Sequence, residues 1–256
     1  MKKVVLSTQK PVYTLHGTQS DLPLLIYVSG LDGSGELFYK QLPSLTRNYR
    51  IVTYRLREDA RATYDDLSDD IASIIEDLGE TQAIILGESF GGTIVLHFAL
   101  RYPTFTQRLV LVNSFPYYRR RLRIQLAAFL ASALPARFVV PFRLTSAALG
   151  LLVDRVSRED RKKIVQILRS VEMKSYARRL QLIAQVDVTN RLNEIQAPTL
   201  LIATERDLLV PSVREAREMQ KRIPNATVKI LRRKGHACLL RDDVKLYELI
   251  KGWLSQ

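Results

Sequence analysis

The chain has 256 residues, 46 % of them hydrophobic, which is enough for one large α/β core. Its single cysteine, Cys238, excludes internal disulfides and the usual multi-cysteine zinc sites, and we predict neither a metal nor a cofactor. The net charge of +13 is uneven, because residues 117–191 hold 16 basic and 5 acidic residues, a net +11.

The N-terminus carries two lysines followed by only three apolar residues, which is too few for a signal peptide. No run of about 18 apolar residues occurs, so no membrane span is predicted. We therefore expect a cytoplasmic protein. Residues 4–7 and 12–16 are expected to form two short strands joined as a hairpin.

A glycine-rich loop at residues 29–35 follows a buried strand expected at residues 24–28. Its spacing fits neither of the common phosphate-binding patterns. We interpret it as one half of an oxyanion hole, in which the backbone N–H groups of Leu31 and Phe90 are the two donors.

A strand is expected at residues 50–54, and residues 63–78 show apolar side chains at the 3.6-residue spacing of a helix. Four aspartates near the start of this helix suit the positive end of its dipole. We interpret them as a solvated helix face rather than a metal site; they are Asp65, Asp66, Asp69 and Asp70.

The most informative motif is the Gly-x-Ser-x-Gly centred on Ser89. It lies between an apolar strand at residues 83–86 and an apolar helix that stops before Pro103. Strand, sharp turn and helix are the context of a nucleophile elbow. The turn predicts a serine with positive φ, flanked by Gly87 and Gly91 because a side chain there would meet the neighbouring backbone. A plain turn is the alternative.

The sixth expected strand, at residues 108–113, is followed by a change of pattern. Residues 116–191 mix apolar residues and arginines at helical spacing, which indicates a helical cap between two parts of an α/β core, 1–115 and 192–256. The basic residues form either a solvated outer face or a contact with an anionic membrane, while no motif supports nucleic-acid binding. The apolar face of this lid over the active site is expected to comprise Leu126, Phe129, Leu130, Leu134, Phe138, Val139 and Phe142.

Strands at residues 199–203 and 227–231 and a final amphipathic helix resume the alternation, which implies a mostly parallel sheet. An acid and a histidine follow these two strands. Asp207 precedes a proline that opens a helix, a position suited to an acid that orients a histidine, and we favour it over Glu205. His236 lies on the loop after the last strand.

Ser89, Asp207 and His236 occur in the chain order expected of a triad built on this elbow. Each follows a predicted strand, so all three can meet at one edge of the sheet. His236 would accept the proton of Ser89, and Asp207 would hold the required tautomer of the histidine. His97 and Cys238 are interpreted as packing residues.

The elbow, the Asp-Leu-Leu-Val-Pro at residues 207–211 and the Gly-His at residues 235–236 together resemble the α/β-hydrolase superfamily. The resemblance implies a mostly parallel central sheet flanked by helices, with a helical cap inserted after the sixth strand. The loop at residues 29–35 and the elbow are similar to the hydrolase-like part of phytyl ester synthases and to related esterase and lipase-like proteins. This likeness implies chemistry on acyl esters, with long-chain lipids among the candidates.

We therefore expect a serine hydrolase that cleaves carboxylic esters of hydrophobic small molecules through an acyl-enzyme at Ser89. An acyltransferase or a C–C bond hydrolase with the same triad is an alternative. A non-catalytic binding protein of this fold, docked on a membrane by its basic cap, is another.

Overall fold

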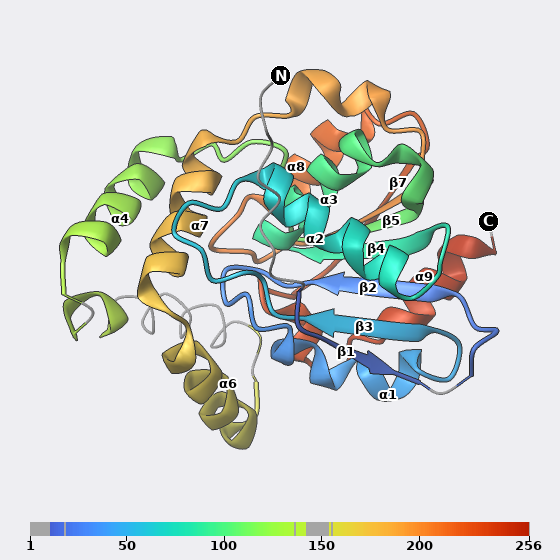
Figure 1. The fold of residues 1–256 in the computed structure, drawn as a ribbon, viewed down its shortest axis with the longest axis horizontal. Helices are drawn as coiled ribbons and strands as arrows, with labels where there is room; N and C mark the ends of the chain where they lie inside the picture. Colours follow the sequence, from blue (N-terminus) through green and yellow to red (C-terminus); the bar gives the residue numbers. More distant parts are fainter. Residues whose placement is uncertain (1–10, 18, 136, 142–153, 155, 256) are drawn as a thin grey trace.

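The computed structural model describes residues 11–17, 19–135, 137–141, 154 and 156–255 (Figure 1). Within them, one seven-stranded sheet has the order β1-β3-β2-β4-β5-β6-β7. β1 runs antiparallel to β3, and the other neighbouring strands are parallel. The strands are β1 (Tyr13–His16), β2 (Leu24–Val28), β3 (Arg50–Tyr54), β4 (Ala83–Glu88), β5 (Thr106–Val112), β6 (Thr199–Thr204) and β7 (Ala226–Leu231).

This sheet confirms the mostly parallel architecture and the strands expected from the sequence within the described residues. The strand expected at residues 4–7 lies outside them, and with it the proposed hairpin. Among the described residues, β1 pairs with β3, with Tyr13 opposite Tyr54.

Helices cover both faces of the sheet because both faces of the central strands are apolar. Leu24 and Ile26 of β2 belong to one core, whereas Leu25 and Tyr27 belong to the other. The first core is closed by α2 (Tyr64–Asp77), α3 (Phe90–Arg101) and α8 (Ser212–Gln220), and the second by η1 (Glu36–Lys40), α1 (Leu42–Leu45) and α9 (Leu246–Leu254). Short 3-10 turns occur at η2 (Pro103–Phe105), η3 (Thr189–Glu194) and η4 (Cys238–Leu240).

Helix α2 begins at a capping box. The Thr63 hydroxyl accepts from the backbone N–H of Asp66 at 3.1 Å, and the Asp66 carboxylate accepts from the backbone N–H of Thr63 at 2.8 Å. The expectation that all four aspartates of this helix are solvated is wrong for Asp70, which is 2 % exposed. Arg57, from the loop before the helix, donates to its carboxylate at 2.9 Å and compensates the buried charge.

Three helices with defined bounds lie between β5 and β6: α4 (Arg121–Ala133), α6 (Arg158–Ser170) and α7 (Met173–Gln185). Residues 137–141 are helical as well. Helix α4 lies at the edge of the molecule, beyond α7 (Figure 1). No helix in the described ranges is both long enough and apolar enough to cross a membrane.

Helix α4 packs on α7 through small residues and Ile124 rather than through the large apolar residues expected there. Ala128 and Ala131 contact a cluster that includes Ala177 and Leu180 of α7. The large residues expected to cover the active site point to solvent instead, because the alanines on the opposite side allow the closer helix contact. Leu126, Phe129, Leu130, Leu134 and Phe138 are all exposed, Val139 is buried, and Phe142 lies outside the described residues.

Candidate active site

Ser89 joins β4 to α3 with φ 54° and ψ −119°, so the positive φ expected at the elbow is confirmed. Its backbone N–H donates to the carbonyl of Val112 at 2.9 Å, which ties the turn to β5. A Cβ at Gly87 would lie 2.5 Å from the Cα of Gly92, and one at Gly91 would overlap the carbonyl oxygen of Val28. The two glycines therefore allow the sharp turn that presents the Ser89 side chain.

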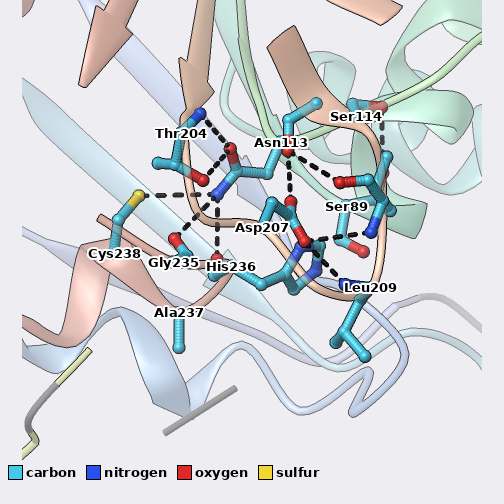
Figure 2. Close-up of polar contacts among 12 residues, drawn as sticks. Ser89, Asn113, Ser114, Thr204, Asp207, Leu209, Gly235, His236, Ala237 and Cys238 are labelled. Carbon is cyan, nitrogen blue, oxygen red and sulfur yellow. Dashed lines mark hydrogen bonds and ion pairs between the residues drawn. The ribbon is translucent and has the colours of Figure 1, made fainter. Parts of the chain in front are cut away.

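His236 and Asp207 are joined directly: the Nδ1 of His236 lies 2.7 Å from the Oδ2 of Asp207 (Figure 2). The Oδ1 of Asp207 accepts from the backbone N–H groups of Leu209 and Val210 at 2.9 Å each, and its Oδ2 also accepts from the Ser212 hydroxyl. These donors fix the carboxylate, which in turn fixes the ring of the histidine.

Glu205, the rival acid, is exposed and accepts from the backbone N–H of Arg233 at 3.1 Å. Asp207 is therefore the acid that the structure brings to His236, whereas Glu205 bonds elsewhere. His97 and Cys238 are packing residues, as expected. His97 stacks on Tyr64, with ring centroids 4.3 Å apart, and Cys238 is buried.

The pKa values of this pair move apart in the directions that keep it ionised. Burial alone would raise the pKa of Asp207, but the facing His236 and the hydrogen bonds to the carboxylate lower it below its ordinary value. Burial alone would lower the pKa of His236, but the charge of Asp207 raises it above its ordinary value. The nearby carboxylate thus strengthens His236 as a base.

Ser89 and His236 both line a cavity of about 350 Å³. Within the described residues no hydrogen bond joins their side chains. Asp207 lies behind the histidine and does not line the cavity. The apolar part of the wall comes from the core and from the helices between β5 and β6. It includes Leu31, Leu37, Phe115, Ile124, Ala127, Ile164, Leu168, Val171, Leu180, Ile183, Leu209, Val210, Ala237 and Leu240.

Of the two residues expected to supply oxyanion donors, Leu31 lines the cavity. Phe90 is the first residue of α3, where a helix leaves its N–H groups without an intrahelical acceptor. In the described part of the chain, neither backbone N–H donates a hydrogen bond. Arg179 of α7 holds the loop from its other side, since its Nη1 donates to the carbonyls of Leu31 at 3.1 Å and Asp32 at 3.0 Å.

A family model described as alpha/beta hydrolase fold matches residues 23–243. The chain belongs to this family. The resemblance inferred from the elbow, the acid and the histidine is therefore confirmed at the level of the superfamily.

Curated relatives and solved structures agree with this α/β hydrolase assignment. A Stutzerimonas stutzeri protein named "Putative carbamate hydrolase RutD" is 27 % identical over 260 residues, covering 95 % of this chain and 96 % of its own length. The enol-lactonase from Burkholderia xenovorans has a TM-score of 0.80 at 17 % identity and covers 96 % of each chain. A thermophilic esterase from Thermogutta terrifontis has a TM-score of 0.79 at 21 % identity, covering 96 % of this chain and 93 % of its own.

Asn113, which the sequence reasoning did not single out, holds the histidine loop of this α/β hydrolase. It follows β5 at φ 49° and is fully buried. Its Nδ2 donates to the carbonyl of His236 at 2.9 Å, while its Oδ1 accepts from the backbone N–H and the hydroxyl of Thr204 at 3.0 Å each (Figure 2). Asparagine tolerates a positive φ, so an asparagine at the end of a strand was the one feature of the sequence that could have pointed to this position.

Asp154 supports the same loop from the segment between β5 and β6. Its carboxylate accepts from the backbone N–H groups of Gly235 at 2.7 Å and Ala237 at 2.8 Å, the residues on either side of His236. Asp154 is 1 % exposed, and its partners lie more than eighty residues away along the chain. No local pattern could have revealed this contact.

Glu88, the residue before Ser89, is a further, half-buried carboxyl at the site. The Tyr27 hydroxyl donates to its Oε2 at 2.7 Å. Burial raises the pKa of Glu88 to about 7, although this hydrogen bond and the nearby His236 act to lower it. The carboxyl lines the cavity, and its charge changes near neutral pH.

Proposed function

We propose that this α/β hydrolase cleaves carboxylic esters with hydrophobic acyl groups, through an acyl-enzyme at Ser89. The names of the relatives and the family itself support hydrolase activity. The observation that carries the finer proposal is an apolar cavity bordered by a strained serine and by a histidine bonded to a buried aspartate. Its size falls within the range of small-molecule sites.

In the proposed reaction the Nε2 of His236 removes the proton of the Ser89 hydroxyl as the oxygen attacks the ester carbonyl carbon. The backbone N–H groups of Leu31 and Phe90 stabilise the oxyanion that forms. His236 then returns the proton to the leaving alcohol, and the C–O bond of the ester breaks. Water, deprotonated by His236, releases the acid and restores Ser89. Asp207 stabilises the imidazolium in both halves.

The wall of the cavity supports a hydrophobic substrate. Leu168, Leu180 and Leu240 are among the apolar side chains that surround the space in front of Ser89. Burying an apolar chain there contributes about 25 cal/mol per Å² of surface removed from water. Every methylene in contact with the wall therefore adds to binding.

Carbamate hydrolysis is the second candidate function, because the Stutzerimonas stutzeri relative and two further curated relatives carry the name "Putative carbamate hydrolase RutD". A carbamate carbonyl can be attacked by the same serine and stabilised by the same N–H groups. The apolar wall favours the ester, because it offers a small polar carbamate few partners for hydrogen bonds.

The test is the hydrolysis of p-nitrophenyl esters from short to long acyl chains, beside a p-nitrophenyl carbamate. Ser89→Ala is the variant, and Ser20→Ala, at an exposed serine, is the matched control. We expect kcat/KM to rise with acyl length, and turnover to disappear in Ser89→Ala while its thermal unfolding stays that of the parent. Turnover retained in Ser89→Ala would refute the assignment of the nucleophile. A preference for the carbamate over every ester would refute the assignment of the substrate.

A further inference from the structure

Helix α4 presents a row of large apolar side chains to solvent. Leu122, Leu126, Phe129 and Leu130 follow the i, i+4, i+7, i+8 spacing of one helix face. They are 83 %, 58 %, 66 % and 39 % exposed, respectively. Phe138, beyond the end of the helix, is 58 % exposed. We call these five residues the outer stripe.

The outer stripe remains exposed after the helix has made its contacts within the chain. Ala128 and Ala131, on the other side of α4, pack on α7. Helix α4 lies at the edge of the molecule (Figure 1), where the side chains of the outer stripe are exposed to solvent. Large apolar side chains gathered in this way on one exposed face mark an interaction surface.

The charge around the outer stripe is of one sign. Residues 117–141 contain five arginines and no acidic residue. Arg119 pairs with Glu215 and Arg121 with Asp187. Arg120, Arg123 and Arg137 are exposed and form no ion pair with any acid in the described part of the chain. These guanidinium groups, of which that of Arg137 lies over the ring of Phe138, have no acidic partner and are therefore available to an anionic one.

We propose that α4 docks this protein on an anionic lipid bilayer. The outer stripe would enter the boundary between headgroups and acyl chains, as the apolar face of an interfacial helix does. The arginines beside it would pair with lipid phosphates, which they bind bidentately. A second copy of the chain fits this face poorly, because it would bring a second set of unpaired arginines against the first.

The same helix forms part of the cavity wall. Arg123, Ile124 and Ala127 line the space in front of Ser89, whereas the outer stripe points to solvent. Docking through α4 would therefore bring the cavity close to the bilayer, which is the source of hydrophobic acyl esters. The docking goes beyond the proposed function and does not require ester cleavage.

The test is flotation of the full chain with lipid vesicles. One set consists of phosphatidylcholine alone, and the other contains about one quarter phosphatidylglycerol. The test variant is Leu126→Glu with Phe129→Glu, two residues that do not line the active-site cavity. The matched control is Leu254→Glu, whose side chain is 43 % exposed at the far end of the chain, on α9. Arg120→Gln with Arg137→Gln tests the charge.

We expect the parent and the Leu254→Glu control to float with the anionic vesicles at low salt and much less at high salt. The binding constant of the double glutamate variant should fall at least about tenfold, with turnover of a short, soluble ester unchanged. The glutamine pair should weaken binding and flatten its salt dependence. Ser89→Ala should bind as the parent does, so a failure of the proposed chemistry would leave this result intact.

Absence of binding to anionic vesicles at low salt would overturn the proposal. So would binding that the double glutamate variant retains. Sedimentation velocity tests whether the outer stripe binds a second copy of the chain. If the parent self-associates but does not bind vesicles, and the double glutamate variant does not self-associate, the outer stripe is a contact between two copies instead.

Discussion

Replacing Asp154 by asparagine should loosen the loop that carries His236. The carboxylate accepts two hydrogen bonds, from the backbone N–H groups of Gly235 and Ala237. An asparagine keeps one acceptor oxygen, but its NH₂ group faces the second N–H and leaves that buried donor unpaired. An unpaired buried donor costs about 1–3 kcal/mol.

Part of that cost is offset, because burial raises the pKa of Asp154 and the neutral amide avoids the desolvation of a charge. We therefore expect a net loss of about 1–2 kcal/mol in the free energy of unfolding. For a domain of this size, this loss lowers the Tm by about 2–8 °C. Because the broken bond lies beside His236, we also expect kcat/KM to fall about tenfold through misplacement of the ring.

The assay combines thermal unfolding, followed by circular dichroism, with kcat/KM on the best p-nitrophenyl ester. Asp21→Asn, at an exposed position, is the matched control and should leave both quantities unchanged. A Tm of Asp154→Asn within about 1 °C of the parent, together with unchanged kcat/KM, would show that this carboxylate does not hold the histidine loop.

Three further predictions follow from the same site. Gly91→Ala should cost more than about 3 kcal/mol of stability, because its Cβ would meet backbone that has no room to move. Gly252→Ala in α9, with open space around it, should gain about 0.5–1 kcal/mol. Chemical denaturation measures both, and a Gly91→Ala variant as stable as the parent would contradict the geometry. In the proposed reaction the neutral form of His236 is the base, and its folded pKa is raised, so the acid limb of the pH profile of kcat/KM should lie above pH 6.5. In Asp207→Asn the acid limb of the residual activity should lie at lower pH. An acid limb at the same pH in both proteins would show that the His236–Asp207 pair does not produce it. The folded pKa of Glu88 is about 7 against an ordinary 4.5, so the folded state binds more protons than the unfolded state between these pH values. The parent should therefore lose stability as the pH rises through this range, whereas Glu88→Gln should not. Parallel curves of stability against pH for the two proteins would contradict this prediction.

Local patterns in the sequence were sufficient for the strands, the elbow and the triad candidates. Ser89 needs a strand before it, a helix after it and glycines beside it, and all of these lie within a few residues. The contact between Asp207 and His236 could be predicted because each follows a strand, and the ends of parallel strands meet at one edge of the sheet.

Contacts between distant segments could not be read in the same way. Asn113 and Asp154 bond a loop that lies far along the chain, so neither has a neighbour that reveals its role. Asp70 has the same local sequence pattern as its three solvated neighbours, and only its contact with Arg57 distinguishes it. In α4, the apolar pattern predicts that the large residues are buried. The alanines form the contact with α7 instead, because small side chains allow helices to approach closely.

Helix α7 sets a limit on how the substrate pocket can be re-engineered. Leu182 and Ile183, near its C-terminal end, belong to the core that α2, α3 and α8 close on one face of the sheet. Arg179 holds the loop of Leu31. A chimaera that replaces α4 and α6 but stops before α7 would exchange much of the pocket wall and leave the loop of Leu31 supported. One that replaces α7 as well would remove a piece of the core, so loss of folding would conceal any change in substrate range. The natural crossover point for recombination in this scaffold is the short turn between α6 and α7, at Val171 and Glu172.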